Sequence, residues 1–365
     1  MLVPSKRILI YRLGSLGDTI IALPVFHLVR HCYPDAYITL LTNKPVKSKA
    51  APLESVLGTG YFFNRTLPYS VGTRSVRTLF GLIKQIRELE IDTVIYLVGV
   101  RGADNLAKAK ATVLRDRLFF KAAGVKRIVG LPNTIADYLT VQDVNTGMLE
   151  WEAKRLARRV NTLGTIDLND DRNWDLKFSV AEINAAKAAV LNIHSDKPVI
   201  VISTGTKSPV NDWGESNWQA LVSRLKSILT NWQLIMIGGP DEFDQAQRYV
   251  TDWGPRSINL CGKVSPRLSG LVLKSAQVFV GHDSGPMHLA ACVGTPCVGI
   301  FSARHLPGQW FPRGRNNRII YHKTDCAGCL LDVCIVQKKK CILSITVNEV
   351  EAAILELLDN LNLGK

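Results

Sequence analysis

The chain lacks the long apolar segments of a membrane-spanning or exported protein. No apolar run approaches the roughly 20 residues needed to span a bilayer. The N-terminus passes from Lys6 and Arg7 directly into an apolar strand pattern, without the apolar stretch and small-residue cleavage site of a signal peptide. Because 47% of the residues are hydrophobic and 21% are charged, the composition is that of a globular protein. We therefore expect a soluble protein of the cytoplasm.

Three motifs of familiar enzyme classes are also absent. The turn after the first predicted strand has its glycines at positions 14 and 17, which is not the G-x-G-x-x-G spacing of a dinucleotide site and disfavours a nicotinamide oxidoreductase. No two aspartates stand one residue apart, as they do in the D-x-D motif with which many sugar-nucleotide enzymes hold a divalent metal. The G-x-S-x-G elbow of serine hydrolases is missing too. These absences favour metal-independent chemistry, and we expect no cofactor.

Acidic residues are scarce relative to basic ones. The chain has 45 Lys and Arg against 31 Asp and Glu, with a formal charge of +14 and a pI near 9.5. Many of the cations gather in the N-terminal half, within 101–127 and 44–49. Such a surface attracts anions, although a charge run is most often a solvated helix face. Nucleic acid is disfavoured as a partner, because no zinc finger, DNA-reading helix or aromatic-interleaved basic strand accompanies the charge.

The length of 365 residues exceeds what one hydrophobic core usually organises, so two domains are expected. In the first half, apolar strand patterns alternate with helical ones, which predicts a doubly wound parallel sheet. Its strands are expected at 7–11, 38–41, 94–97 and 128–130, with helices from about 18, over 76–89 and before Gly124.

The same alternation restarts near residue 198. After a helix over 181–190, strands are expected at 199–202, 234–237, 278–280 and 298–301, with helices near 217–229, 242–250, 268–276 and 287–293. The pattern predicts an α/β protein with two Rossmann-like domains facing a central cleft, at 1–175 and 176–345. A last helix within 346–365 could pack back on the first domain.

The most informative segment is V-G-H-D-S-G-P-M-H-L at 280–289, which combines the end of an apolar strand, a glycine turn and a proline-started helix. Free N–H groups at such a helix start favour phosphate, and a carboxylate there can bind ribose hydroxyls, so a nucleotide site is predicted. Its candidate residues are Asp283, Ser284, Gly285 and His288. In the alternative, the aspartate or the serine only caps the helix and the histidine packs.

The turn after the first strand, R-L-G-S-L-G-D-T, carries a second candidate. It places Asp18 at the carboxyl edge of the first sheet and at a helix start, where open α/β sheets bind ligands. A carboxylate there can act as a general base toward a substrate hydroxyl about 3 Å away. In the alternative, Asp18 only caps the helix that follows.

A third polar loop follows the strand at 199–202 and begins T-G-T-K. Thr204, Gly205 and Thr206 suit a diphosphate, and Lys207 would neutralise negative charge on a leaving phosphate. The plainer alternative is a polar surface loop closed by the packing of a tryptophan.

A weaker signal comes from I-G-G-P-D-E at 237–242, another glycine-rich strand end that opens a helix. Alone it carries little weight. We nevertheless add Gly239 and Glu242 to the candidate donor-binding residues.

Four of the eight cysteines, at 326, 329, 334 and 341, form a C-x2-C-x4-C-x6-C run. One C-x-x-C pair suggests zinc, but the second pair is too widely spaced for a typical zinc ribbon. A structural role, a metal site and disulfide pairing all stay open, and no metal ligand is assigned.

Together, four segments resemble glycosyltransferase family 9, which contains the heptosyltransferases of lipopolysaccharide core synthesis. They are the R-L-G-S-L-G-D-T-I-I-A-L-P start, the T-G-T-K loop with its D-W-G-E-S-N-W continuation, I-G-G-P-D-E, and V-G-H-D-S-G-P-M-H-L-A-A. The resemblance implies a GT-B fold and an inverting transfer from a nucleotide sugar, usually ADP-heptose. The implied acceptor is a phosphorylated, lipid-linked saccharide.

The resemblance also implies roles for single residues. Asp18 matches the family's proposed base, which takes the proton of the acceptor hydroxyl as that hydroxyl attacks the anomeric carbon. Residues 283–288 match the family's D-[ST]-G-x-x-H nucleotide motif, and Thr204 and Thr206 lie in its phosphate loop.

The chain departs from the family just before Trp213, where Asn211 and Asp212 stand in place of a lysine. Either Lys207 has taken over the neutralisation of the diphosphate, or the donor is bound differently. His282, where the family commonly has asparagine or aspartate, is a smaller departure.

The sequence therefore predicts a metal-independent glycosyltransferase that moves a heptose or related sugar onto a lipopolysaccharide-core-type acceptor by single displacement. Asp18 and Lys207 are the expected catalytic residues. The expected acceptor contacts are Gly14, Ser15, Gly17 and Arg101. The basic N-terminal face would meet acceptor phosphates and anionic lipid at the inner face of the cytoplasmic membrane. A sugar-nucleotide epimerase of GT-B architecture and a non-catalytic nucleotide-binding scaffold stay open as alternatives.

Overall fold

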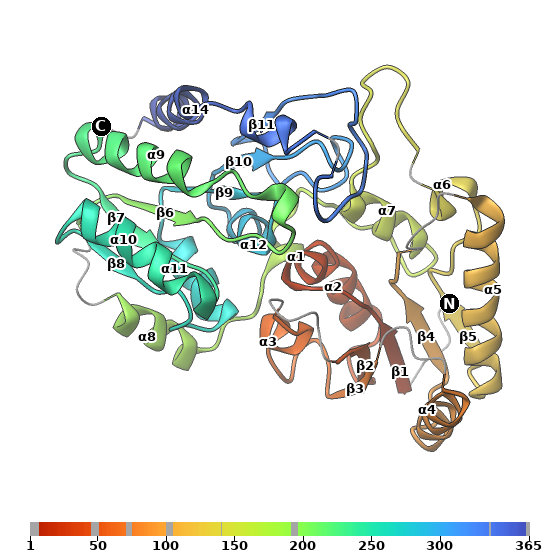
Figure 1. Cartoon of the computed structure of the whole chain (residues 1–365). Coiled ribbons are helices and arrows are strands. Elements are labelled where there is room, and N and C mark those ends of the chain that lie inside the picture. The colour runs from red at the N-terminus through yellow and green to blue at the C-terminus, as the bar shows by residue number, and fades with distance from the viewer. Residues whose placement is uncertain are drawn as a thin grey trace. The chain divides into compact units, whose positions relative to one another are not determined.

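The computed structural model describes residues 7–44, 51–70, 75–99, 105–139, 141–190, 196–335 and 337–362. The chain divides into two compact units, Met1–Lys177 and Phe178–Lys365. Each unit contains one parallel β-sheet covered by helices, as Figure 1 shows. The predicted α/β class, with a Rossmann-like sheet in each half of the chain, is confirmed.

The sheet of the first unit has the order β3-β2-β1-β4-β5, with every neighbouring pair parallel. Its strands are β1 (Arg7–Tyr11), β2 (Tyr37–Asn43), β3 (Arg65–Tyr69), β4 (Thr93–Tyr96) and β5 (Arg127–Val129). In the central strand β1, Ile8, Leu9 and Ile10 are completely buried, because helices cover both faces of the sheet.

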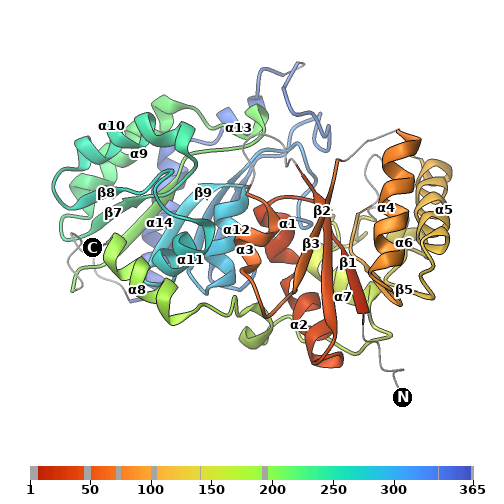
Figure 2. The ribbon, with the colours of Figure 1, turned by 90° about the horizontal axis from the view of Figure 1, so that it is seen from below.

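The helices of the first unit are α1 (Leu16–Ile21), α2 (Leu23–Cys32), α3 (Leu53–Leu57), α4 (Val76–Glu88), α5 (Leu106–Ala122), α6 (Ile135–Tyr138) and α7 (Glu152–Arg159). The α4 and α5 helices cover one face of the sheet, and α1 and α2 cover the other (Figures 1 and 2). On the first of these faces the rings of Tyr96 and Phe120 pack edge-on against Tyr11, each with a centroid distance of 5.4 Å. Their burial fixes α5 against the strands β1 and β4.

The sheet of the second unit has the order β11-β10-β9-β6-β7-β8, again with parallel neighbours. Its strands are β6 (Val199–Ser203), β7 (Gln233–Met236), β8 (Ser257–Asn259), β9 (Val278–His282), β10 (Cys297–Phe301) and β11 (Asn317–Tyr321). Its helices are α8 (Val180–Ala189), α9 (Glu215–Ile228), α10 (Phe243–Trp253), α11 (Pro266–Lys274), α12 (Gly285–Cys292), α13 (Lys340–Leu343) and α14 (Val347–Asn360). Four buried tryptophans contribute to its core: Trp213, Trp218, Trp232 and Trp253.

The C-terminal helix α14 belongs to the second unit. A capping box starts it, because the main-chain N–H of Thr346 donates to Oε2 of Glu349 over 2.7 Å. Its apolar stripe, which includes Ile354 and Leu358, joins the core of this unit and packs against α9, β10 and β11. The helix predicted within 346–365 is therefore present, and its buried face is used inside the second unit.

The predicted strands of both halves are present within a few residues of their expected bounds. Three strands were not predicted: β3, β8 and β11. Each lies at an edge of its sheet, and β8 has only three residues, so their apolar signal is weak. No helix in the parts of the chain described above is both long and apolar enough to cross a membrane.

Candidate functional site

Three polar loops lie side by side at the carboxyl edge of the second sheet. The strands β9, β6 and β7 are direct neighbours, and Ser203 at the end of β6 pairs with Gly281 near the end of β9. Because parallel strands end at the same edge, the loops that begin at Thr204, Gly238 and Asp283 come together there. These are the loops in which the sequence predicted the nucleotide contacts.

The side chain of Glu242 joins two of these loops. A Cβ atom on Gly205 or on Gly238 would overlap the Glu242 carboxylate, so the carboxylate lies directly against both stretches of main chain. Gly239 precedes it as the N-cap of a 3-10 helix at Pro240–Glu242. Glycine at 205 and 238 therefore lets a carboxylate sit at the level of the strand ends, where it can accept hydrogen bonds from sugar hydroxyls.

The start of α12 presents an unsatisfied hydroxyl. Ser284 is the N-cap of this helix, but its side chain makes no capping hydrogen bond. Its Oγ is buried and has no hydrogen-bond partner among the described residues. The interpretation in which Ser284 caps the helix through its side chain is therefore wrong. A buried hydroxyl without a partner, beside the free N–H groups of a helix start, fits a ligand oxygen.

Asp283 and His288 lie close to each other on either side of Ser284 in the sequence. Oδ1 of Asp283 lies 3.9 Å from Nε2 of His288, and the two side chains are 15% and 6% exposed. Next to Asp283, a small cavity is lined by aromatic rings, including those of Trp310, Phe311 and Tyr321. The sequence analysis missed this aromatic wall, because 301–321 shows neither helical nor strand periodicity.

The T-G-T-K loop is closed by a buried tryptophan, as its plainer interpretation predicted. Trp213 is completely buried, and its indole N–H donates to the carbonyl of Ile345 over 2.8 Å. Within the loop, Thr204 is buried, Thr206 donates to the carbonyl of Ser208 over 3.3 Å, and Lys207 is exposed. The packing of the tryptophan thus fixes the end of the loop and leaves its threonine and lysine segment at the sheet edge.

Two cations that the sequence analysis missed contact this loop. Nζ of Lys339 donates to the carbonyl of Asp212 over 2.8 Å and lies 3.4 Å from its Oδ2. Arg304 donates through Nη1 to Oγ of Ser208 over 2.8 Å. No local pattern could have identified them, because Lys339 is 127 residues away from Asp212 in sequence. A lysine from elsewhere in the chain therefore stands beside the position at which the family's own lysine is absent.

Asp18, in the first unit, is the third residue of α1 and completes the capping box at the start of that helix, whose N-cap is Ser15. Its Oδ2 accepts hydrogen bonds from the main-chain N–H of Ser15 over 2.9 Å and from the Ser15 hydroxyl over 3.1 Å. Its Oδ1 lies 3.8 Å from Nη2 of Arg12, and the side chain is 25% exposed. The capping alternative placed the helix after Asp18, whereas α1 begins at Leu16, so Asp18 is not its N-cap. Its carboxylate does bind the helix start, through Ser15. The side chain nevertheless keeps about a quarter of its surface accessible.

Gly14 makes room for this carboxylate. It has a φ of +140°, and a Cβ atom at this position would overlap the Asp18 side chain. Its N–H donates to Oδ1 of Asn43, at the end of the neighbouring strand β2, over 3.0 Å. Gly17 is buried inside α1. The structure therefore brings Gly14, Ser15, Gly17 and Asp18 together, whereas Arg101 lies outside the described residues.

None of the eight cysteines, which all lie in the described part of the chain, forms a disulfide. Within the described ranges, no three His, Cys, Asp or Glu side chains are grouped so that they could hold a metal ion. Cys326, Cys329 and Cys334 are half-buried, and burial raises the pKa of the Cys341 thiol. Disulfide pairing, one of the three interpretations of the cysteine run, is therefore not formed in the structure.

Comparison with known proteins identifies the family. The profile of glycosyltransferase family 9 (heptosyltransferase) matches residues 118–340. Lipopolysaccharide heptosyltransferase 3 of Escherichia coli is 23% identical over 296 residues, which cover 79% of this chain and 81% of that protein.

Solved structures agree on the fold. A glycosyltransferase family 9 protein from Veillonella parvula has a TM-score of 0.69 at 17% identity over 99% of both chains. An ADP-heptose lipopolysaccharide heptosyltransferase II from E. coli has a TM-score of 0.63 at 16% identity over 98% of this chain and 99% of the other. The expected GT-B fold is thereby confirmed. The chain belongs to glycosyltransferase family 9, the heptosyltransferase family.

Proposed function

We propose that this protein transfers a heptose from ADP-heptose, by a single inverting displacement and without a metal ion, to a phosphorylated saccharide of the lipopolysaccharide core. The family assignment supports the transfer, and an E. coli protein of the same fold is described as an ADP-heptose enzyme. The observation that carries the proposal is the convergence of three loops at one sheet edge, with the Glu242 carboxylate and the unpartnered Ser284 hydroxyl among them.

The second unit binds the donor in this proposal. Glu242 and Asp283 accept hydrogen bonds from ribose hydroxyls, and the Ser284 hydroxyl and the first N–H groups of α12 donate to phosphate oxygens. Lys207 neutralises the charge that develops on the departing diphosphate. The aromatic wall next to Asp283 provides an apolar surface for the base. Thr204 and Thr206 add hydroxyl donors to the same diphosphate.

Asp18 is the general base in the first unit. Its carboxylate accepts the proton of an acceptor hydroxyl while the hydroxyl oxygen forms a bond to the anomeric carbon of the heptose. The bond from that carbon to the diphosphate breaks on the opposite face, so ADP leaves and the configuration inverts. Positioned general bases typically contribute a factor of about 10² to 10⁴ to the rate.

The acceptor is anionic and lipid-linked in this proposal, so the protein works at the inner face of the cytoplasmic membrane. The formal charge of +14 favours such a surface. An anionic leaflet attracts each nearby Lys or Arg by about 1 kcal/mol.

The test is a transfer reaction with ADP-heptose and core acceptor extracted from a heptose-deficient strain, followed by mass spectrometry and ADP release. We expect acceptor-dependent release of ADP that persists in excess chelator. ADP release without acceptor, with an altered free sugar, would replace the proposal by the epimerase alternative. Donor binding with no product on any acceptor would leave a nucleotide-binding scaffold.

A further inference from the structure

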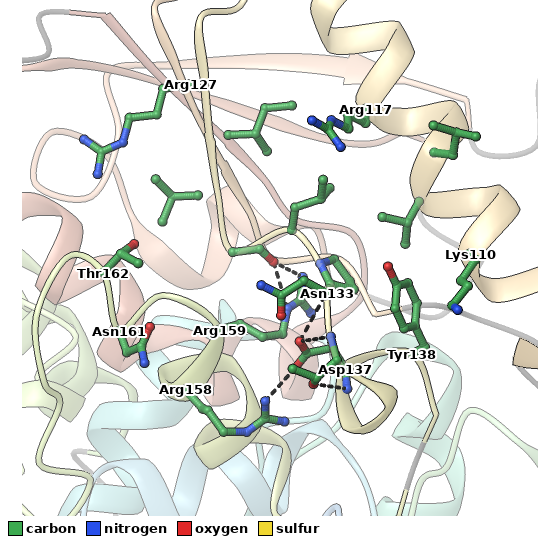
Figure 3. A pocket seen from close by; sticks show the side chains of 18 residues that line it. Lys110, Arg117, Arg127, Asn133, Asp137, Tyr138, Arg158, Arg159, Asn161 and Thr162 are labelled. Carbon is green, nitrogen blue, oxygen red and sulfur yellow. Dashed lines mark hydrogen bonds and ion pairs between the residues drawn. The ribbon is translucent and has the colours of Figure 1, made fainter.

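A large cavity lies in the first unit, away from the turn that carries Asp18. Its volume is about 840 Å³, which is within the usual range for a ligand site. It runs beside β5, the edge strand of the sheet, and is lined by α5, by the loop that follows β5 and by the end of α7 (Figure 3). All of its walls belong to one unit.

The lining is strongly basic. Five of its side chains are Lys or Arg, and Asp137 is its one acidic residue. Two of the cations have structural partners. Arg158 pairs with Asp137 over 2.6 Å and with Glu150 over 2.9 Å. Arg159 donates to main-chain carbonyls, among them that of Gly130 over 2.8 Å. These two arginines build the wall of the cavity and are not available to a ligand.

The other three cations have no acidic partner among the residues that the structure describes. Lys110 and Arg117 make neither an ion pair nor a hydrogen bond through their side chains with any described residue. They are seven residues apart on α5, so they lie on one face of the helix about 10 Å apart along its axis. Within the described ranges, the guanidinium of Arg127 donates only to the hydroxyl of Tyr33, over 3.2 Å. Three unneutralised charges around one cavity call for an anionic ligand.

Neutral polar groups complete the lining. Figure 3 shows Tyr138 near Lys110 on one side of the cavity, and Asn161 and Thr162 on the other side. Asn133 lies between them. Amide and hydroxyl groups exchange hydrogen bonds with sugar hydroxyls, and the face of a tyrosine ring packs against the apolar face of a sugar. A simple inorganic anion would leave most of this lining unused.

We propose that this cavity binds a phosphorylated saccharide, with phosphate groups at Lys110, Arg117 and Arg127. The inference rests on the proposed function, because it identifies where the phosphorylated part of the acceptor is held. The loop 130–134 leaves β5 at the same sheet edge at which Asp18 follows β1, and the two strands are separated only by β4. Two strand spacings amount to about 10 Å, so the loop 130–134 and the turn that carries Asp18 follow strands about 10 Å apart.

Titration calorimetry with glucose 1,6-bisphosphate as the probe, and with glucose as the uncharged control, tests the proposal. Lys110→Ala/Arg117→Ala removes the two cations of α5 and should weaken binding by about 10-fold or more. Lys121→Ala/Lys126→Ala removes the same charge from exposed positions outside the cavity and should leave binding within about 2-fold. Thr162→Trp fills the cavity without a change of charge and should also weaken binding.

The outcomes separate the sources of the phosphate. Binding of the bisphosphate that is lost in the cavity variants and kept in the control supports the proposal. No binding by the unmodified protein, or equal loss in the control, overturns it. Binding to vesicles of phosphatidylglycerol in phosphatidylcholine is measured in parallel. If the protein binds the vesicles but not the bisphosphate, and the cavity variants lose the vesicle binding, the proposal is overturned in favour of a lipid site. ADP-heptose binding is measured on the unmodified protein and on every variant. If the unmodified protein does not bind ADP-heptose, that result contradicts the proposed function and not the cavity proposal.

Discussion

The main-chain N–H of Trp213 donates a hydrogen bond to Nε2 of His282 over 3.1 Å. His282 is the completely buried last residue of β9, so this bond ties the loop after β6 to the strand that leads into Asp283. Because Nε2 accepts, the imidazole carries its proton on Nδ1 and is neutral. Two of the three loops of the candidate donor site are thus joined by a residue at which the chain departs from the family pattern.

This bond makes the second unit sensitive to acid. Burial lowers the pKa of His282 to about 4, and that of His305 to about 4 as well. In the unfolded chain these two histidines become protonated below about pH 6.5, whereas in the folded chain they stay neutral down to about pH 4. The free energy of unfolding therefore falls as the pH falls through this window. We expect a loss of about 2 kcal/mol per histidine between pH 7 and pH 5. Denaturant unfolding at the two pH values measures it.

His282→Asn should remove about half of that pH dependence, and adding His305→Asn should remove most of the remainder. The range from pH 7 to pH 5 lies above the titration of ordinary carboxyl groups, so acidic residues contribute little. If the double variant lost as much free energy of unfolding between pH 7 and pH 5 as the unmodified protein, neither histidine would be held neutral by the folded state.

Asp18→Asn should lower the rate of transfer by about 100-fold or more while ADP-heptose binds normally, because the amide cannot accept the acceptor proton. Ser15→Ala is the matched control, since it removes a hydrogen bond to Oδ2 and keeps the carboxylate. It should cost less than about 10-fold. If Asp18→Asn and Ser15→Ala lost activity to the same extent and had equally lowered melting temperatures, Asp18 would only stabilise the start of α1 and would not be the base.

Gly205→Ala should weaken donor binding without unfolding the protein. The added Cβ would overlap the carboxyl end of Glu242, a flexible side chain that can move away from the main chain. We therefore expect a loss of about 10-fold in ADP affinity with a melting temperature close to that of the unmodified protein. Gly81→Ala is the control, because nothing lies within 4 Å of that Cβ and the exchange should stabilise α4 by about 0.5–1 kcal/mol. Unchanged ADP affinity in Gly205→Ala would exclude Glu242 from the donor site.

Lys339→Ala should weaken ADP binding by about 3- to 5-fold, because it leaves the Asp212 carboxylate unneutralised in the phosphate loop. Adding Asp212→Asn should restore most of that loss. Lys340→Ala, at the adjacent exposed position, is the control and should have little effect. Failure of the second substitution to restore affinity would show that Lys339 acts on the ligand directly or on the fold, and not through Asp212.

Much of the fold could be predicted from the sequence, because each central strand is a continuous apolar run followed by glycine or a polar turn. The run around Leu9 and the run from Val278 are of this kind, and both are buried in the centre of a sheet. Edge strands such as β3 were missed, because Pro68 and half-exposed positions interrupt their pattern.

The candidate site could be predicted where its residues follow a strand directly or lie in the glycine turn after one. Thr204 and Asp283 were found in the first way, and Asp18 in the second. Arg304 and Lys339 could not be found, since their contacts with the phosphate loop depend on chain segments about a hundred residues away. The sequence indicated the cavity beside β5 only through the excess of basic residues within 101–127. The cavity itself could not be predicted, because residues at the end of α7 complete its wall.

In the proposed function, the loops after β6, β7 and β9 form an ADP-heptose site. Calorimetric titration with ADP-heptose, and with UDP, GDP and dTDP sugars for comparison, tests it most directly when Asp283→Ala and Ser284→Ala are measured alongside. We predict selective, metal-independent binding of ADP-heptose that is lost in Asp283→Ala and weakened by about 10-fold in Ser284→Ala. Binding that is equally strong in both variants, or no binding of any nucleotide sugar, would contradict the account.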